Sequence, residues 1–191
     1  VAPSVLHSPD ELIINAINCK TPVLFIENKL DYSREMYPIN QMIEDMIEIE
    51  KVDETDFPIY RTSIVDENPE ITFITYGGMV KKALEIQEQV YLDEEIAIEV
   101  IALSNVSDIN PEQLSQNLRT NLVYTLEESW VKFGWGSYVI SELIQKKSFQ
   151  RIKALGSKNY YIPAAKSLEE FILPTNKTII EEVLRDYNGK R

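Results

Sequence analysis

The feature that most restricts the fold of this chain is a strand-like run that stops at two adjacent glycines and leads directly into an amphipathic helix. Residues 71–76 are β-branched or aromatic throughout, which is typical of a buried strand, and Gly77 and Gly78 follow at once. Apolar residues then recur at helical spacing over 79–91, and a second apolar run covers 96–103. This order predicts a parallel strand–helix–strand crossover, which is normally right-handed.

The same alternation continues to the C-terminal end of the sequence. Apolar strands are predicted at 121–126 and 149–155, and amphipathic helices at 108–118, 137–147 and 176–187. Strands that alternate with helices predict an α/β fold, here a three-layer α/β/α domain with a mostly parallel sheet.

The first part of the chain has too few elements to form a core of its own. Proline and two acids after a serine cap predict a helix that begins at Pro9, and 22–27 reads as a short apolar strand. One helix and one strand cannot enclose a core. Residues 1–33 are therefore predicted to be the remnant of a second α/β domain, and the initial valine favours a cut inside a longer polypeptide.

Residues 34–60 are predicted to form an acidic helical insert and a linker, with the main domain running from 61 to 191. The linker signal itself, rich in acids and prolines, covers 52–69. Over 38–51, apolar residues at spacings of three and four lie opposite acids, which predicts an amphipathic helix. Its stripe either packs on its own chain or binds a partner. The stripe consists of Ile39, Met42, Ile43, Met46 and Ile47.

Charge and rare residues exclude several classes of function. The formal net charge of −12 would repel nucleic acid and anionic membranes. One cysteine cannot form an internal disulfide, and no basic leader or long apolar run is present, so a cytoplasmic protein is expected. One histidine, His7, and one cysteine cannot supply a zinc or iron site. A Ser-His-Asp arrangement would need His7 to reach across the boundary between the two predicted domains.

Two glycine pairs at helix starts could be mistaken for phosphate-binding loops. Gly134-Trp135-Gly136 has Val139 where a dinucleotide motif needs its third glycine. Gly77-Gly78 lacks the lysine of a Walker loop. Both are interpreted as tight turns.

The candidate interface lies after the strand predicted at 121–126. Glu127 and Glu128 follow it, and adjacent acids on a strand point to opposite faces, so they cannot act as a dyad while the strand continues. Acidic pairs at element ends usually form a solvated rim, but parallel sheets bind ligands and partners at this edge. Trp130 and Trp135 suit either an interface or a core. The candidate interface residues are Glu127, Glu128, Trp130, Trp135, Ile39, Met42, Ile43 and Met46.

Five motifs follow one another in order along nearly the whole chain, except about 34–56. They are PVLFIENKL at 22–30, ITFITYG at 71–77, LEE at 126–128, FGWGS at 133–137 and IPAA at 162–165. This ordered series resembles the β subunit of thiamine-diphosphate-dependent 2-oxoacid dehydrogenases, the E1 component, of the pyruvate dehydrogenase type. The resemblance implies the end of a pyrimidine-binding domain followed by a transketolase C-terminal domain.

The resemblance also implies a function for the parent enzyme. That function is oxidative decarboxylation of a 2-oxoacid and transfer of the acyl group to a lipoyl-bearing E2. Thiamine diphosphate and magnesium would be cofactors of the parent, while the motifs that bind them and the catalytic glutamate lie outside this chain. The implied role here is a non-catalytic assembly domain, with an E1 α-type subunit or domain, a second β-type subunit and an E2 lipoyl acyltransferase as partners.

Two alternatives remain open. One is the C-terminal domain of another thiamine-diphosphate enzyme, such as transketolase or deoxyxylulose-phosphate synthase, although residues 22–32 favour E1. The other is a stand-alone acidic protein-binding module that uses the stripe at 39–47.

Overall fold

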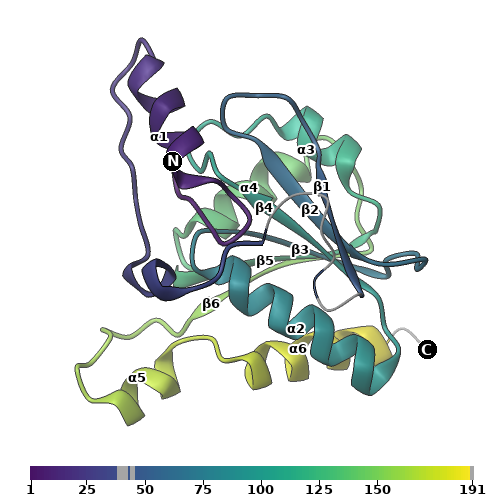
Figure 1. The fold of residues 1–191 in the computed structure, drawn as a ribbon. Helices are drawn as coiled ribbons and strands as arrows, with labels where there is room; N and C mark the ends of the chain where they lie inside the picture. The colour runs from purple at the N-terminus through teal and green to yellow at the C-terminus, as the bar shows by residue number, and fades with distance from the viewer. Residues whose placement is uncertain (38–42, 44–45, 190–191) are drawn as a thin grey trace.

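The computed structural model describes residues 1–37, 43 and 46–189, and it is built around one six-stranded sheet (Figure 1). Four neighbouring strands run parallel, and the strand Ile59–Ile64 (β2) runs antiparallel to both of its neighbours. The mostly parallel sheet that the sequence predicts is therefore confirmed. In spatial order the strands are β1 (Ile47–Lys51), β2 (Ile59–Ile64), β4 (Ile98–Leu103), β3 (Ile71–Tyr76), β5 (Leu122–Trp130) and β6 (Arg151–Ser157).

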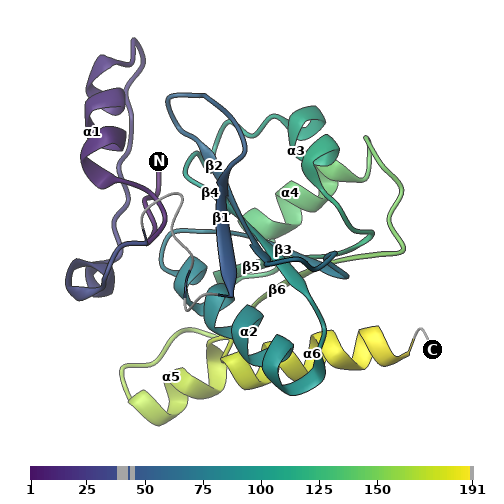
Figure 2. The ribbon, with the colours of Figure 1, turned by 45° about the vertical axis from the view of Figure 1, so that its right-hand side comes forward.

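Helices cover both faces of the sheet, which gives the predicted three layers (Figures 1 and 2). On one face, α2 (Met79–Glu94) and α6 (Asn176–Asn188) enclose a core around Phe73. On the other face, α3 (Pro111–Asn117) and α4 (Trp135–Leu143) enclose a second core around Ile101. A short helix, α5 (Lys166–Ile172), precedes α6. No helix formed by the described residues is long and apolar enough to cross a membrane.

The strand–helix–strand unit at 71–103 forms as predicted. Strands β3 and β4 pair in parallel, with Phe73 opposite Val100, and α2 connects them. Gly77 makes the turn into α2 with φ at +55°, a conformation that glycine adopts without the steric cost of a Cβ. The two glycines therefore mark a tight turn, as expected.

The helix predicted over 38–51 is wrong where the structure describes it. Residues 47–51 form β1, in which Ile47 and Ile49 are buried and Glu48 and Glu50 are exposed. That alternation has a period of two, and it prevails because β2 offers a strand to pair with. Residues 47–50 therefore fit two patterns, a helical spacing and a strand alternation, and the structure follows the strand alternation.

The linker predicted over 52–69 is also wrong in part, because it contains β2, every residue of which is buried. The apolar pattern of a buried strand is absent here, because three of the buried residues of β2 are polar or charged. Thr62 Oγ1 donates to Gln87 Oε1 at 2.8 Å, and Arg61 pairs with Glu50 at 2.8 Å and with Glu99 at 3.3 Å. The hydrogen bond to Gln87 and the ion pairs of Arg61 reduce the cost of burying these polar groups, although Arg61 Nε and Glu99 Oε2 form an ion pair without a hydrogen bond. The sheet thus includes two strands from the predicted insert and linker.

The N-terminal segment is formed by α1 (Pro9–Asn18), as predicted, an extended stretch at 22–28 and the 3₁₀ helix η1 (Lys29–Ser33). The predicted strand at 22–27 forms no ladder with the described residues, and Leu24 is 74% exposed. Figure 2 shows α1 projecting away from the sheet. The start of the chain is nevertheless attached to the sheet domain, because the Ala2 amide donates to the Ser104 carbonyl at 2.8 Å.

His7 strengthens this attachment. Its ring is fully buried, 4.8 Å from the Tyr60 ring in an edge-on contact. Nε2 lies 3.1 Å from the carbonyl oxygen of Pro58, which can only accept, so Nε2 carries the proton and Nδ1 accepts from Ser4 Oγ at 2.7 Å. Burial lowers the pKa of His7 from 6.5 to about 4. The ring therefore belongs to the core in its neutral form.

We predict that His7 makes the chain less stable in mild acid. Below the unfolded pKa of 6.5 the unfolded chain binds a proton that the folded chain rejects down to about 4, so stability is present above 6.5 and falls as the pH drops. The loss from about pH 7.5 to about pH 5 should be about 2 kcal/mol. Urea unfolding at the two pH values measures it. A His7→Gln variant should show a smaller dependence, and an equal dependence in both proteins would contradict the assignment.

Candidate functional site

The sheet has one edge at which open α/β folds usually place their sites. From β3 the chain crosses to β4 on one side, and it then returns to form β5 on the other side of β3. The switch point is therefore between the carboxyl ends of β3 and β5. A hollow of about 420 Å³ lies there. Tyr76, Gly78 and Met79 line it from the β3–α2 turn, Glu128 and Ser129 from β5, and Ile26, Asn28 and Lys29 from the N-terminal segment.

Glu127 is the central side chain of this edge. Strand β5 continues beyond the predicted end at residue 126, so Glu127 points inward and is fully buried. Its Oε1 accepts the Gly136 amide at 2.9 Å, its Oε2 accepts the Trp135 amide at 3.0 Å, and Ser129 Oγ donates to Oε2 as well. The carboxylate thus binds the first turn of α4, where the helix dipole and the free amides favour a negative charge.

Two glycines make this close approach possible. A Cβ at Gly134 would overlap the Trp130 carbonyl oxygen and come within 2.5 Å of Glu127 Oε1. A Cβ at Gly136 would overlap Thr125 Oγ1 and lie 2.9 Å from the same carboxylate oxygen. The interpretation of these glycines as a tight turn is confirmed, and the amides that a phosphate would need at α4 are taken by Glu127.

The two adjacent acids have different roles. The opposite orientation predicted for them is confirmed, because Glu128 is exposed and Glu127 is fully buried. The solvated-rim interpretation is wrong for Glu127, whose hydrogen bonds to α4 hold it inside the fold. Of the two, only Glu128 is accessible to a partner.

The two tryptophans lie in different environments, one packed against the core and one at the surface. Trp135 packs into the core around Ile101, donates from Nε1 to the Val106 carbonyl at 3.0 Å, and contacts the Tyr76 ring edge-on at 4.6 Å. Burial is the main cause that raises the pKa of Tyr76, and the negative charges of the neighbouring Glu127 and Glu128 add to it. Trp130 remains 37% exposed and contacts the Tyr161 ring at 6.0 Å. Trp130 is therefore the better interface candidate.

The predicted stripe is only partly visible. Ile39 and Met42 lie outside the described residues. Ile43 is buried in a cluster with Val5 and Ile47, and Met46 packs against the same cluster. The described residues of the stripe therefore pack on their own chain and do not form a surface for a partner.

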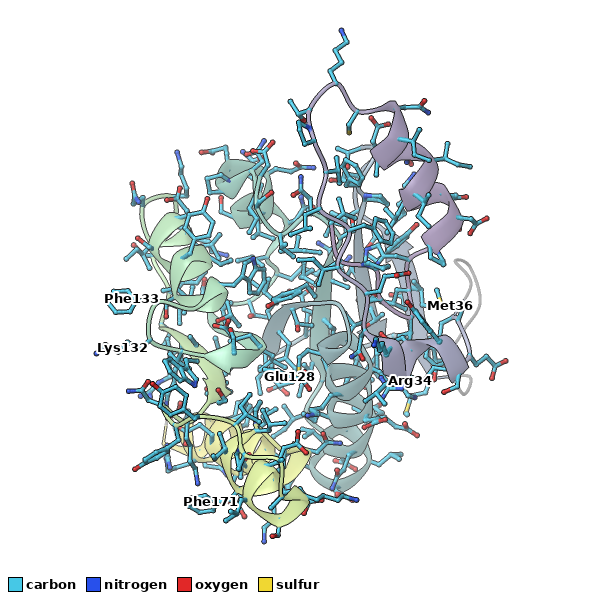
Figure 3. The ribbon with its side chains drawn as sticks, turned by 90° about the vertical axis from the view of Figure 1, so that its left-hand side faces the viewer. Arg34, Met36, Glu128, Lys132, Phe133 and Phe171 are labelled. Atoms are coloured by element: carbon cyan, nitrogen blue, oxygen red, sulfur yellow. The ribbon has the colours of Figure 1, made fainter. Side chains whose placement is uncertain are left out.

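The most exposed aromatic side chains of this edge are not among the candidate interface residues predicted from the sequence. Phe133 is 95% exposed and Tyr161 is 89% exposed. The backbone of Phe133 has φ at +59°, a left-handed conformation that costs a bulky residue energy and often marks functional loops. Figure 3 shows Phe133 and Lys132 projecting from the left margin of the molecule. The available signal was an aromatic loop, Tyr160-Tyr161-Ile162, outside any amphipathic element.

Among residues 1–37, 43 and 46–189, no three His, Cys, Asp or Glu side chains are grouped in a way that could hold a metal ion. The turn at α2 is also unsuited to a phosphate. Asn28 packs so closely on Gly78 that a Cβ there would overlap it. Lys81 and Lys82, in the first turn, donate to Tyr37 Oη and to the Pro174 carbonyl.

Comparisons with known proteins agree with this fold. The family model described as "Transketolase, C-terminal domain" matches residues 61–179. The chain is 27% identical over 188 residues to the pyruvate dehydrogenase E1 component subunit beta of Rickettsia felis, covering 96% of this chain and 53% of the relative. It is 27% identical over 178 residues to the mitochondrial counterpart of Saccharomyces cerevisiae, covering 90% of this chain and 46% of the relative. The chain thus spans about half the length of the curated relatives it matches.

A solved structure of a split-gene transketolase, an inactive β4 tetramer, superimposes with a TM-score of 0.66 at 21% identity. The superposition covers 95% of this chain and 55% of the transketolase chain. This likeness supports the fold alone.

We predict that Glu127→Gln destabilises the chain by about 2–3 kcal/mol, because the amide group would place a donor against the donor amides of α4. The matched control is Glu128→Gln, the exposed neighbour, which should change stability by less than about 0.5 kcal/mol. Urea unfolding of the three proteins measures both. Equal effects of the two substitutions would show that the α4 contact is not what stabilises this edge.

Proposed function

Because the chain belongs to the family of transketolase C-terminal domains, we propose that it is the assembly domain of an E1-type 2-oxoacid dehydrogenase. Its similarity to E1 beta subunits of pyruvate dehydrogenase favours this enzyme. In the parent enzyme, decarboxylation of the 2-oxoacid and acyl transfer to a lipoyl-bearing E2 would take place at residues outside this chain. The chain itself would pair subunits and shape the approach to that active site.

The observation that carries the proposal is the distribution of exposed large apolar side chains. Most of them occur in two parts of the chain, the N-terminal segment and the loops around β5, β6 and α5. The N-terminal segment and the end of β5 line the same hollow at the carboxyl edge, and Figure 3 shows Met36 of the first part and Phe133 and Phe171 of the second on different sides of Glu128. Concentrated apolar exposure of this kind marks protein interfaces. The N-terminal group is Ile13, Ile14, Ile17, Leu24, Ile26, Leu30, Tyr32 and Met36, and the loop group is Trp130, Phe133, Tyr160, Tyr161, Ile162, Leu168 and Phe171.

The two groups suggest two different partners. The exposed Leu24 and Ile26 suit residues 1–33 as the end of a pyrimidine-binding domain, whose remaining strands would cover them. The loop group, with Phe133 and Tyr161 at its centre, suits an E1 α-type subunit or domain or a second β-type subunit. An E2 acyltransferase would dock on the assembled enzyme.

Thiamine diphosphate and magnesium belong to the proposed parent enzyme, but the described residues do not fit them. A diphosphate needs free amides or cations, and Glu127 occupies the first amides of α4. Asn28 packs over the turn at α2. The described carboxylates and the one histidine form no group that would hold the metal. We therefore assign this chain no part in binding either.

Calorimetry should find no saturable heat when thiamine diphosphate and magnesium are titrated into this chain. The reason is that Glu127 binds the first amides of α4 and that Asn28 packs over the turn at α2. A saturable isotherm would contradict the proposed division of labour between this chain and the rest of the enzyme.

We predict that Phe133→Ala and Tyr161→Ala each weaken association with the E1 α-type subunit by at least about tenfold, since exposed aromatic anchors contribute most to such interfaces. Sedimentation velocity of the mixed proteins measures the association. Leu92→Ala and Ile144→Ala provide controls, because Leu92 is exposed in the last turn of α2 and Ile144 is exposed at the C-terminal end of α4. They should change the affinity by less than about twofold.

Two outcomes would contradict the proposal. Association that is equally sensitive to all four substitutions would mean that the loop group is not the interface. A chain that binds no E1 subunit would favour the stand-alone acidic module. Turnover in a transketolation assay of the full-length protein would instead favour a transketolase.

A further inference from the structure

The loop group surrounds a wide hollow of about 700 Å³ at the end of β5. Trp130, Phe133, Tyr161 and Ile162 supply apolar side chains to its walls. Of the described residues that line it, Lys132 alone carries a charge. Because the whole chain has a net charge of −12, this hollow is opposite in sign to the protein around it. The hollow therefore combines an apolar lining with one cation.

A second lysine beside the loop group has the same surroundings as Lys132. Lys132 Nζ lies 5.7 Å from the centre of the Phe133 ring, and Lys158 Nζ lies 3.3 Å from the centre of the Phe171 ring. Within the described part of the chain, neither lysine forms an ion pair with a carboxylate. A ring face attracts an ammonium group but accepts few of its three N–H donors. Each ammonium is therefore held at the surface with donors left for a partner.

The two lysines are carried by one connected piece of structure. Ser157, which precedes Lys158, pairs with Trp130 at the ends of β6 and β5. Trp130 Nε1 donates to the Tyr160 carbonyl at 2.9 Å, and the Trp130 ring contacts the Tyr161 ring at 6.0 Å. The loop that follows β6 is thus attached to the end of β5, and both lysines belong to the same surface.

The shape of this surface suits a protein and not a small ligand. A small-molecule pocket encloses most of its ligand. Phe133 and Tyr161 are instead 95% and 89% exposed, so they project outward and enclose nothing. Figure 3 shows Phe133 and Lys132 together at the margin of the molecule. Projecting aromatic side chains of this kind enter pockets on a partner protein, where they become anchors.

The charge of the hollow argues against a symmetric contact with a second copy of this chain. A two-fold contact brings the same patch of both copies together. Lys132 of one copy would then face a hollow whose one charged lining residue, among those described, is the same lysine. Like charges brought together in this way oppose association. A partner of different sequence, with carboxylates around its pockets, fits the surface better.

We propose that the loop group docks on a face of the E1 α-type subunit that places carboxylates opposite Lys132 and Lys158. Phe133 and Tyr161 would enter apolar pockets between those carboxylates. The inference rests on the proposed function and adds the chemistry of the partner's surface. Charge pairs at the rim of an aromatic contact fix the choice of partner and its orientation.

The first test is cross-linking of the mixed proteins with a water-soluble carbodiimide. The reagent activates a carboxylate, a lysine amine in contact with it displaces the activated group to form an amide, and the reagent leaves as a urea. Mass spectrometry should find Lys132 and Lys158 joined to Asp or Glu residues of the α-type subunit. Cross-links to that subunit through other lysines alone would overturn the proposal, and cross-links to a second copy of this chain would overturn the choice of partner.

The second test is the affinity of charge variants, measured by sedimentation velocity. A chain with both Lys132→Gln and Lys158→Gln should bind the α-type subunit at least about tenfold more weakly, because two interfacial charge pairs are lost. The corresponding double arginine variant keeps both cations over their rings, so its affinity should stay within about threefold while the cross-links disappear.

The matched control is Lys177→Gln, which removes the same charge from an 83% exposed side chain on α6. Its affinity should change by less than about twofold, since an exposed charge outside the contact contributes little. Equal weakening by Lys177→Gln would show that the net charge of the chain acts and that the two lysines have no specific partner. Thermal melts identify any variant that fails to fold.

Phe133→Ala, measured in parallel, separates this inference from the proposed function. If Phe133→Ala weakens association and the double glutamine variant does not, the loop group is the interface and the carboxylate pairing is wrong. If neither changes the association, the loop group is not the interface and the proposed function loses its support as well.

A chain that does not bind the α-type subunit at all would overturn both.

Discussion

The contact between the Glu127 carboxylate and the first turn of α4 fixes the arrangement of the whole carboxyl edge. Both carboxylate oxygens accept helix amides, and the side chain is fully buried. A buried charge is tolerated only where donors surround it, and here they are the amides that a helix start leaves unpaired. Gly134 and Gly136 lie so close to the same carboxylate that a Cβ at either position would overlap its neighbours, which restricts the path of the chain from β5 into α4. The position of the exposed Phe133, one residue before this turn, follows from that constraint.

The sequence was informative where local pattern and tertiary environment agree. The unit at 71–103 has one dominant periodicity in each element, and its fold follows from that periodicity alone. Strand β2 could not be found in this way, because Arg61, Thr62 and Ser63 resemble a loop until Glu50, Glu99 and Gln87 are known to face them. Strand β1 was predicted as part of a helix for a different reason. Its alternation of buried and exposed residues covers only 47–50, whereas the helical spacing that overlaps it is longer.

The candidate site shows the same division. Proximity of the end of β5 to the carboxyl edge follows from the parallel topology, so Glu128 and Trp130 could be named from sequence. Burial of Glu127 could not, since it depends on where β5 ends, and element ends are the least predictable part of a sequence reading. Exposure of Phe133 and Tyr161 was equally hidden, because an aromatic residue outside an amphipathic element can lie in a core as easily as on a surface.

The same hydrogen bonds also decide what kind of site this edge can be. Parallel sheets commonly bind phosphates here because helix starts present free amides, and this chain has two such starts after glycine turns. At α4 the amides are bonded to Glu127, and at α2 Asn28 from the N-terminal segment packs on Gly78. Both helix starts of this edge are therefore in contact with side chains of the same chain, and neither presents an open set of amides to a phosphate. What the edge still offers is an outer surface held in place by buried contacts, and a surface of exposed aromatic side chains is suited to another protein.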